Sequence, residues 1–195
     1  TCNIVPAPEA FASDNVDCIK QDMAGAKAML DAAGWKAGAD GIREKDGKKL
    51  HLVYQTTVNP VRQDFQSLIK SWWTELGVDV ELKSIDASVF FGGDAGSPDT
   101  YQKFYADVEM FANNFDGTDP EAFLAQYKCD KIPSPKLQWQ GENVPRFCDP
   151  AYDKLADEMS QTADVAKRGE LAKKLNDMVT KDAYATVPLV DRGRL

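Results

Sequence analysis

Two aspartates in the segment Phe115-Asp116-Gly117-Thr118-Asp119-Pro120 are the first residues whose type and spacing suggest chemistry. Paired carboxylates serve in general acid–base catalysis or as calcium ligands. The spacing of an EF-hand loop is absent, and both aspartates stand where turns favour Asp. The single histidine, His51, lies in a strand pattern, so a Ser-His-Asp site has no support. We therefore expect no catalytic site, no metal and no cofactor.

The four cysteines fall into two close couples, Cys2 with Cys18 and Cys129 with Cys148. Neither couple has the C-x-x-C spacing of a zinc or redox site. An even number, with partners within about 20 residues of each other, suggests two local disulfides, which are one of three connectivities. Four reduced, buried thiols are the alternative. Disulfides would place the chain in an oxidising compartment, such as the periplasm or the cell exterior.

Composition narrows the class of protein. The formal charge of −8 and the pI near 4.7 argue against nucleic-acid binding, which needs a basic patch. With 43% hydrophobic and 28% charged residues, the chain has globular composition. No apolar run approaches the roughly 20 residues of a membrane span. The N-terminus has no signal-peptide pattern and no initiator Met, so we expect an excised piece or a mature product.

Three irregular stretches are candidate ligand-binding segments: residues 90–100, 113–119 and 129–148. The first two follow predicted strands, and open α/β sheets bind ligands at strand ends. Together the stretches supply aromatic surface and orienting polar groups, as a small-molecule cleft does: Phe90, Phe91, Asn114, Phe115, Trp139, Asn143 and Arg146. Packing as loop anchors in the core is the alternative for Phe90, Phe91 and Phe115. Trp139 differs, because its neighbours Gln138, Gln140 and Gly141 show no apolar periodicity.

The elements that would hold these stretches begin with a helix over residues 22–33, which Gly34 ends. Asp46-Gly47 predicts a hairpin turn between strands at 42–45 and 50–54. Asn59 as N-cap and Pro60 at the first helical position open a second helix, and Gly77 stops it. Its apolar stripe is predicted to be Val61, Phe65, Leu68, Ile69, Trp72 and Leu76.

A strand at 78–83 follows this helix, so strand, helix and strand form a right-handed parallel crossover. A third strand is expected at 106–112. Residues 90–98 are glycine-rich and are expected to lack regular structure. The fold class is therefore α/β, with a mixed sheet flanked by helices.

The remaining segments are expected to be helical, apart from one long loop and one strand. Pro120 opens a short helix carrying Phe123, Leu124 and Tyr127. Residues 128–150 form a long loop, which a disulfide at its base would order. One helix starts at Asp149-Pro150, and Asp164 caps another, with Val165 among its inward residues. Residues 185–190 close the chain as a strand at a sheet edge.

Several of these segments, in the same order, resemble the second lobe of the family 5 solute-binding proteins, the periplasmic or lipid-tethered receptors of ABC importers for peptides, opines, nickel and some sugars. The matching residues run nearly from end to end: Ala26-Lys27-Ala28-Met29-Leu30-Asp31-Ala32-Ala33-Gly34-Trp35, Asp40-Gly41-Ile42-Arg43, Asp46-Gly47-Lys48, Arg62 with its helix, Val78-Asp79-Val80-Glu81, Asp116-Gly117-Thr118-Asp119-Pro120, Asn143-Val144-Pro145-Arg146-Phe147 and Val187-Pro188-Leu189.

The resemblance implies one lobe of a two-lobed (class II) binding-protein fold, with residues 1–195 as a single lobe cut from a longer parent. In members that bind dipeptides, an Asp four residues before the motif's Pro pairs with the ligand's amino group, and Asp116 holds that position. An ordinary Asp-Gly turn is the alternative for Asp116. Such members carry a disulfide around the following loop, as Cys129–Cys148 would. Arg146 either holds a ligand carboxylate or pairs with a neighbouring acid.

The function predicted is therefore a ligand-binding lobe, not an enzyme. It would deliver a small solute, a peptide or related amino compound, to the membrane subunits of an ABC importer when the two lobes close. Its partners would be the ligand, the first lobe of the parent and the importer, in the periplasm or outside the cell. Two alternatives stay open: a secreted hydrolase using Asp116 and Asp119, and a stand-alone interaction module.

Overall fold

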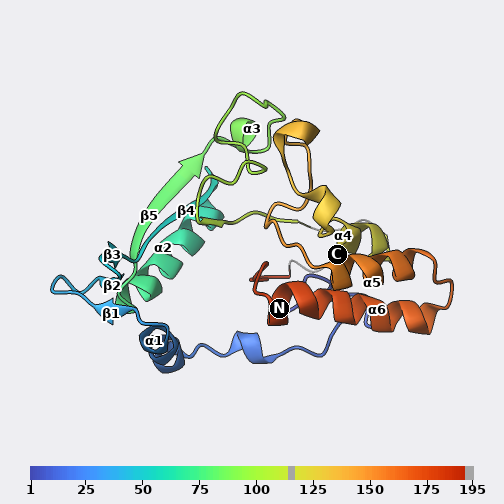
Figure 1. The fold of residues 1–195 in the computed structure, drawn as a ribbon, viewed down its shortest axis with the longest axis horizontal. Coiled ribbons are helices and arrows are strands. Elements are labelled where there is room, and N and C mark those ends of the chain that lie inside the picture. The colour runs from blue at the N-terminus through green and yellow to red at the C-terminus, as the bar shows by residue number, and fades with distance from the viewer. Residues whose placement is uncertain (114–116, 192–195) are drawn as a thin grey trace. The chain divides into compact units, whose positions relative to one another are not determined.

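The computed structural model describes residues 1–113 and 117–191, which divide into two compact units (Figure 1). Unit 2 comprises residues 21–112, and unit 1 comprises residues 1–20 together with 113–195. Unit 2 is therefore inserted into the sequence of unit 1. The assignment of residues 1–195 to a single receptor lobe stays a prediction.

A parallel sheet organises unit 2. Strand β4 (His51–Thr57) lies between β5 (Asp79–Ile85) and β6 (Val108–Glu109), and both neighbours run parallel to it. Helix α2 (Pro60–Glu75) connects β4 to β5 and packs on both strands. The predicted parallel crossover is confirmed, and so is the α/β class. The third predicted strand forms, but it covers only Val108–Glu109 of residues 106–112.

Helix α2 starts as predicted but buries only part of the predicted apolar stripe. The Asn59 side chain accepts a hydrogen bond from the Arg62 amide, and Pro60 occupies the first turn. Ile69 and Leu76 pack on the sheet as expected, beside the buried Gln66. The predicted stripe is wrong for the other face, where three members are exposed: Val61 (62%), Leu68 (54%) and Trp72 (41%). Both faces of this helix are apolar, so helical spacing did not identify the buried one.

The buried Gln66 makes its own polar contacts inside this layer. Its Nε2 donates to the Tyr54 carbonyl at 2.8 Å and to the Lys83 carbonyl at 3.3 Å. A buried amide is tolerated where such bonds replace those to water. Tyr54 lies under the same helix, and burial raises the pKa of its hydroxyl to about 12.

A second sheet of unit 2 consists of β1 (Lys36–Ala37), β2 (Arg43–Lys45) and β3 (Lys48–Lys49), all antiparallel. The turn at Asp46-Gly47 is confirmed, but the second arm is β3, because residues 51–57 join the parallel sheet instead. Buried Arg43 links helix α1 (Met23–Ala32) to the end of α2: its Nη1 contacts Asp31 Oδ1 and its Nε donates to the Leu76 carbonyl, both at 2.6 Å. Helix α3 (Ala87–Phe90) ends at Phe90, and residues 91–98 form no helix or strand, as predicted.

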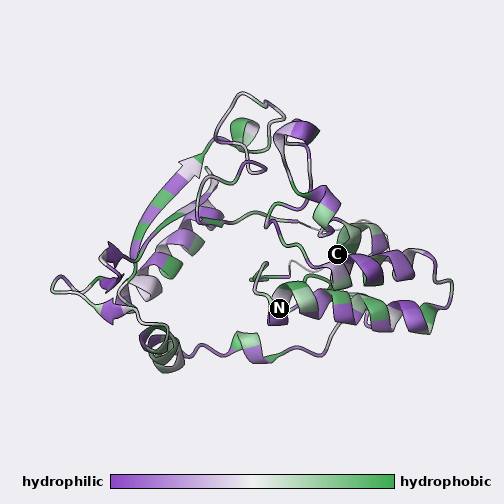
Figure 2. Ribbon diagram, viewed as in Figure 1, coloured by the Kyte–Doolittle hydropathy of each residue, from purple (hydrophilic) through white to green (hydrophobic). Residues whose placement is uncertain are grey.

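Unit 1 is helical in its described part. Helices α5 (Pro150–Ser160) and α6 (Val165–Asp177) run side by side, and α4 (Glu121–Ala125) packs on both. Asp149 and Asp164 cap α5 and α6, each accepting a backbone N–H bond at 2.8 Å. Both helices alternate between hydrophilic and hydrophobic residues, as Figure 2 shows. A π-helical turn, η4 (Met178–Asp182), continues α6, and three short turns complete the unit: η1 (Asp17–Ile19), η2 (Cys129–Lys131) and η3 (Pro135–Leu137).

The first residues of the chain are part of the core of unit 1. Val5 and Phe11 are buried among the helices, and Ile4 donates its backbone N–H to Asn176 Oδ1 at 2.9 Å. Asn176 Nδ2 in turn donates to Asn3 Oδ1 at 3.0 Å. Disulfides Cys2–Cys18 and Cys129–Cys148 both form, which confirms the predicted pairing. Unit 1 is thus closed by contacts between residues more than 170 positions apart.

Two predictions about unit 1 are wrong. Residues 185–190 form no strand, because no strand in the described residues lies beside them. Val165, expected to face inward, is 63% exposed, because it occupies the first turn of α6, outside the helix pair. Of the helices in the described ranges, none has the length and apolar character needed to cross a membrane.

Candidate functional site

The carboxyl ends of the parallel strands form one candidate site, in unit 2. Strands β4, β5 and β6 end at Thr57, Ile85 and Glu109, and because they are parallel these ends lie at one edge of the sheet. Ligands of open α/β sheets bind outside this edge. Two of the predicted site residues, Phe90 and Phe91, come from the segment that follows β5.

An aromatic cluster covers this edge. It consists of Phe90, Phe91, Tyr101 and Phe111, and each ring centroid lies within 6.4 Å of the other three. Phe90 is fully buried and packs edge-on against Phe91, at 4.9 Å between centroids. Phe91 is 45% exposed. Phe90 therefore supports the cluster from below, whereas Phe91 presents aromatic surface to solvent.

Arg62 brings a cation to the same place. Its guanidinium carbon lies 5.7 Å from the centroid of the Phe91 ring, within the range of cation–π attraction. Its Nη1 donates to the hydroxyl of buried Thr57 at 2.6 Å. The carboxyl end of the sheet therefore combines an exposed aromatic face with a positive charge that is hydrogen-bonded to the last residue of β4.

Arg62 is part of the family resemblance but was not predicted as a site residue. A signal was available, because Arg62 lies in the first turn of α2. The helix dipole is positive at that end and disfavours a cation there, so an arginine at this position indicates another partner. Thr57 and Phe91 are among its partners in the structure.

The disulfide-bracketed loop, residues 129–148, is the second candidate, in unit 1. Asn143 is fully buried at its centre. The Asn143 Nδ2 donates to the carbonyls of Tyr127 and Lys128, both at 2.9 Å, and to that of Phe147 at 2.6 Å. Its Oδ1 accepts the Phe147 amide at 3.1 Å. These bonds join both ends of the loop beside the disulfide, so Asn143 acts here as a scaffold residue.

Backbone conformation fixes the tip of this loop. Gly141 packs so closely that a Cβ there would lie 2.3 Å from the Lys131 carbonyl oxygen, so only glycine fits. Gln138 and Trp139 both adopt left-handed backbone, with φ of 51° and 64°. A bulky residue rarely adopts this conformation, and such positions cluster at functional sites. Trp139 is half-buried, and its amide donates to the Ser134 carbonyl at 2.9 Å.

Arg146 lies at the far end of the loop and also has left-handed backbone, with φ of 59°. Its side chain is half-buried, and Nη1 donates to the Val144 carbonyl at 2.6 Å. The backbone amide of Arg146 donates to the Asn143 carbonyl at 3.1 Å. The loop itself therefore holds this cation in part.

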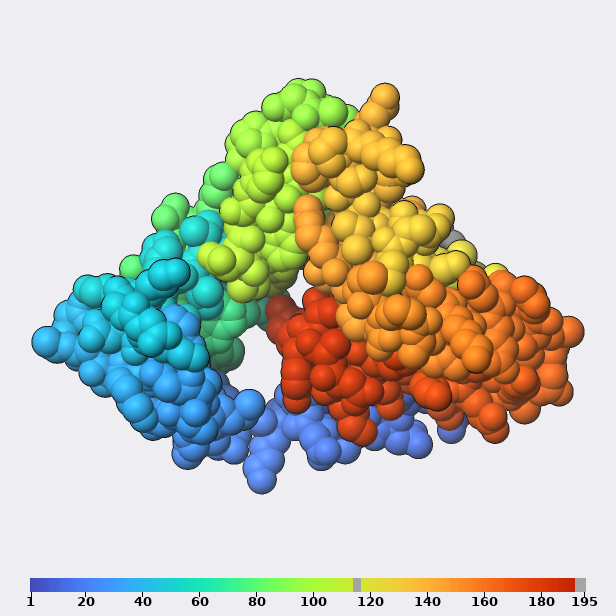
Figure 3. Space-filling view, viewed as in Figure 1, coloured from blue at the N-terminus to red at the C-terminus, as the bar shows by residue number. Residues whose placement is uncertain are grey.

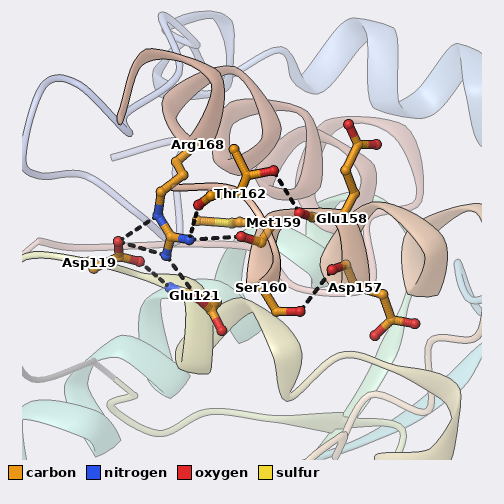
Figure 4. Close-up of polar contacts among 8 residues, drawn as sticks. All are labelled: Asp119, Glu121, Asp157, Glu158, Met159, Ser160, Thr162 and Arg168. Carbon is orange, nitrogen blue, oxygen red and sulfur yellow. Dashed lines mark hydrogen bonds and ion pairs between the residues drawn. The ribbon is translucent and has the colours of Figure 1, made fainter. Parts of the chain in front are cut away.

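Asn114, Phe115 and Asp116 lie outside the described residues, so their predicted roles stay predictions. Asp119, the second aspartate of the motif, is tied to Arg168 of α6 (Figure 4). Arg168 Nε donates to Asp119 Oδ2 at 2.9 Å, and Nη2 reaches Glu121 Oε2 at 2.7 Å. The hydrogen bond from Arg168 holds the pKa of Asp119 below its ordinary value. Asp119 therefore stays ionised at neutral pH.

On its other side, the Arg168 guanidinium caps the C-terminal end of helix α5. Nη1 donates to the carbonyls of Met159 and Thr162, at 2.7 and 2.8 Å. The Met159 carbonyl also accepts the Thr162 amide at 3.1 Å, and a cation at the C-terminal end of a helix is favourable for its dipole. Arg168 thus anchors the start of α4 to the α5–α6 pair. Asp119 serves this anchor, and an acid–base role for it has no support in this geometry.

The candidate residues therefore fall into one set in each unit. Phe90, Phe91 and Arg62 belong to unit 2, whereas Trp139, Asn143 and Arg146 belong to unit 1. Within the described ranges, no group of three or more His, Cys, Asp or Glu side chains is arranged to hold a metal ion. What the two sets offer is aromatic surface and cationic groups, which suit recognition of an organic solute.

Comparison with known proteins agrees with such a role. Residues 3–133 match the model of the bacterial extracellular solute-binding proteins, family 5. The Di/tripeptide-binding protein 3 of Pseudomonas aeruginosa is 28% identical over 144 residues, which are 70% of this chain and 24% of that protein. The oligopeptide-binding protein OppA of Lactococcus lactis is 40% identical over 83 residues, 40% of this chain and 14% of that one.

A solved structure has the same fold. The oligopeptide-binding protein of Thermus thermophilus, in complex with a pentapeptide, aligns with a TM-score of 0.77 at 22% identity, over 92% of this chain and 31% of that chain. The present chain thus spans about a quarter of the Pseudomonas relative and under a third of the Thermus protein.

Proposed function

The chain belongs to the bacterial extracellular solute-binding proteins of family 5, and on this basis we propose that it is the peptide-capturing lobe of an ABC-importer receptor. The match of the family model over residues 3–133 is the observation that carries the proposal. Proteins of this family bind solutes outside the cell and are not enzymes. The alternative of a secreted hydrolase is therefore set aside.

A peptide or related amino compound is the proposed ligand. Both sequence relatives reported above are peptide-binding proteins by name, one for di- and tripeptides and one for oligopeptides. A peptide carries an amino group, a carboxylate and side chains of varied polarity. Arg62 offers a cation for an anionic group, and exposed Phe91 offers a face for an apolar side chain. These features support the proposal.

Ligand contacts in unit 1 are proposed for Trp139 and Arg146, with Asn143 and the disulfide holding their loop. Asp116 would pair with the ligand's amino group, as the resemblance implies. A carboxylate that pairs with an ammonium group away from water forms a charge-assisted hydrogen bond, roughly twice as strong as a neutral one. Asn114 and Phe115 would line the same place.

The mechanism we propose is closure of two lobes around the ligand. Residues 1–195 would be one lobe, because the chain spans about a quarter of the length of the Pseudomonas relative. The remainder of the parent would form the first lobe, and the membrane subunits of the importer would recognise the closed form. The parent would work in the periplasm or at the cell surface.

Affinity tests this proposal against a stand-alone interaction module. Each lobe supplies only part of the contact, while the entropic cost of capturing the ligand stays nearly the same. If the full-length parent binds di- and tripeptides near micromolar, about −8 kcal/mol, this chain alone should bind no better than about millimolar, near −4 kcal/mol. Calorimetry on both proteins, with the same peptides, measures the difference. Equal affinities would favour the stand-alone module.

Two aromatic substitutions test the site in unit 2. In the full-length parent, Phe91→Ala should weaken peptide binding by at least about tenfold, which corresponds to 1.4 kcal/mol. Trp72→Ala is the matched control, because Trp72 is exposed to a similar extent, 41%, but lies on α2 away from the aromatic cluster. It should leave binding unchanged. A similar loss in both variants would remove Phe91 from the site.

A further inference from the structure

Thr57, the last residue of β4, is buried at the carboxyl end of the parallel sheet. It is 2% exposed and stands opposite Ile85, the last residue of β5. The next amide, that of Val58, donates to the Ile85 carbonyl at 2.8 Å, so the backbone is held on both sides of Thr57. A β-branched side chain also has few rotamers open to it. The sheet therefore fixes the position of the Thr57 hydroxyl.

Arg62 reaches this hydroxyl from the first turn of α2. The Arg62 backbone amide donates to Asn59 Oδ1 at 3.2 Å, which fixes the base of the side chain. Its Nη1 donates to Thr57 Oγ1 at 2.6 Å, while its guanidinium carbon lies 5.7 Å from the centroid of the Phe91 ring. The guanidinium is thus held from two directions, by a hydroxyl and by an aromatic ring.

Phe91 is held as firmly as Thr57. Its amide donates to the Ala87 carbonyl at 3.0 Å, and its ring packs on the other three rings of the aromatic cluster. Gly92 follows so close to α3 that a Cβ there would lie 2.6 Å from the Ser88 carbonyl oxygen. The segment after β5, green in Figure 3, lies at the surface of unit 2. The ring that faces the guanidinium is therefore fixed at a place that a solute can reach.

Two effects oppose a fixed guanidinium at this position. An arginine side chain has many rotamers, and a ligand that had to immobilise it would bind more weakly. The positive end of the α2 dipole also disfavours a cation in the first turn. The Thr57 hydroxyl counters both effects before a ligand arrives, because it offers a hydrogen-bond acceptor whose own position is fixed.

We propose that Thr57 is a positioning residue of the binding site in unit 2. Its hydroxyl holds the Arg62 guanidinium at the Phe91 ring, and this placement makes the site prefer a ligand with a carboxylate to the same ligand as a neutral amide. Thr57 is itself buried and acts through Arg62 rather than on the ligand. The proposal rests on the proposed function, which makes Arg62 and Phe91 ligand contacts.

Thr56, the preceding residue of β4, provides a matched control. It is also buried, at 0% exposed, and its hydroxyl donates to the Met110 carbonyl at 2.6 Å. Replacing either threonine by valine therefore removes one hydrogen bond of the same length from the same strand. The Thr56 bond goes to the backbone that follows β6, whereas the Thr57 bond goes to the side chain of Arg62.

Calorimetry on the full-length parent measures the preference for a carboxylate. Three probes are compared: trialanine, its C-terminal amide, and an amidated tripeptide whose middle aspartate carries the only carboxylate. Thr57→Val should lower the preference by about tenfold, the size expected for one hydrogen bond to a charged group. Thr56→Val should leave the preference unchanged, although both variants should lower the melting temperature alike.

The three probes also locate the carboxylate on the ligand. A loss confined to trialanine against its amide assigns it to the C-terminus of the ligand. A loss confined to the aspartate peptide against the trialanine amide assigns it to an acidic side chain. Either result supports the proposal, and an unchanged preference in Thr57→Val overturns it.

Two further variants separate positioning from damage to the sheet. Thr57→Ser keeps the hydroxyl and should keep the wild-type preference. In an Arg62→Gln background, Thr57→Val should change the preference no further, because its effect passes through Arg62. An equal loss in that background would overturn the proposal. Thr57→Ala serves in the same comparisons if the Val variant does not fold.

Chemical labelling follows the hold on Arg62 without any peptide. Phenylglyoxal modifies arginine side chains, and mass spectrometry of the digested parent gives the rate at Arg62. This rate should rise at least about threefold in Thr57→Val, because the bond to Thr57 is lost. It should stay at the wild-type value in Thr57→Ser and in Thr56→Val. An unchanged rate in Thr57→Val would contradict the proposed role.

These measurements let the two proposals fail separately. A parent that binds none of the three peptides, but shows the expected labelling rates, overturns the proposed function and leaves the hold of Thr57 on Arg62 in place. A parent that binds the peptides, with the same preference and the same labelling rate in Thr57→Val as in the wild type, overturns the role of Thr57 alone.

Discussion

The two units of this chain bury their apolar residues to very different extents. Unit 1 has a continuous core, contributed by the N-terminal segment, helices α4, α5 and α6, and residues that directly follow α4 and α6: Val5, Phe11, Phe123, Leu124, Tyr127, Tyr152, Ala156, Met159, Leu171, Ala172, Leu175 and Val179. In unit 2 the cluster under α2 has three buried members, Tyr54, Val78 and Val80. The outer face of α2 leaves Val61, Leu68 and Trp72 exposed.

This difference shows how each unit holds its candidate residues. In unit 1 a disulfide, Asn143 and Gly141 fix the loop that carries Trp139. In unit 2 the site depends on one layer of aromatic contacts at a sheet edge. Local stability follows buried apolar contact, so unit 1 should open less often than unit 2. Three substitutions test this, each read by hydrogen exchange resolved by unit.

The largest effect is expected in the core of unit 1. Leu175 is fully buried, so Leu175→Ala should lower the free energy of unfolding of unit 1 by about 3 kcal/mol, through lost burial and the cavity left behind. Leu68→Ala removes the same atoms from an exposed position in unit 2 and should change stability by less than about 0.5 kcal/mol. Denaturant-dependent exchange measures both. Equal losses would show that α2 is covered in solution.

An intermediate effect is expected at Arg168. Arg168→Gln removes the cation that joins Asp119 and Glu121 to the carbonyls that end α5, and should destabilise unit 1 by about 1–2 kcal/mol at neutral pH. The pKa of Asp119 is lowered from 3.8 in the folded state, so its contribution is present above that pH and is lost as the pH falls through the folded value.

The difference between wild type and Arg168→Gln should therefore shrink in acid, below about pH 3.8. Lys167→Gln is the control, because Lys167 pairs with Glu158 on the exposed surface beside it. A surface pair of this kind contributes little. A difference that stays constant down to acid pH would mean that the ion pair with Asp119 does not stabilise unit 1.

The smallest effect is expected at the amino end of the parallel sheet in unit 2. His51 Nδ1 lies 2.8 Å from Asp79 Oδ2, and this hydrogen bond raises the pKa of His51 above 6.5. Glu81 and Asp107 act in the same direction. The stabilisation is full below the unfolded pKa of 6.5 and is lost as the pH rises through the higher folded value.

As the pH falls from about 8.5 to about 5.5, unit 2 of the wild type should therefore become more stable relative to unit 2 of His51→Gln. Unit 1 should show no such difference, since His51 is the only histidine. Thermal unfolding at the two pH values, monitored by hydrogen exchange in each unit, measures this difference in stability. An opposite trend in unit 2 would mean that the Asp79 contact does not form in solution.

Elements with local signals were predictable from the sequence. Asn59-Pro60, Asp149-Pro150 and Asp164 each cap a helix where expected, because capping depends on neighbours within one turn. The predictions that failed depended on distant partners. Helix α2 has two apolar faces, and only the sheet decides which is buried. Residues 185–190 have a strand pattern, but a strand exists only beside another one.

Most residues of the candidate site were predictable from the sequence, but the role of each residue was not. The aromatic residues after β5 were found, but sequence alone did not separate buried Phe90 from exposed Phe91, because both share one pattern. Asn143 was named for ligand binding, while its amide serves the carbonyls of Tyr127, Lys128 and Phe147. Arg62 was not named as a site residue, since its partner Phe91 lies 29 positions away (91 − 62).

The insertion of unit 2 within unit 1 dictates an order of events during synthesis. Residues 21–112 hold every strand of the parallel sheet, so this unit has all its parts once the ribosome has passed residue 112. Val5 and Phe11 must wait for α5 and α6, and Asn3 for Asn176, before they are covered. Non-local closure of this kind is slow. The apolar side chains of residues 1–20 thus stay uncovered until α6 has been made.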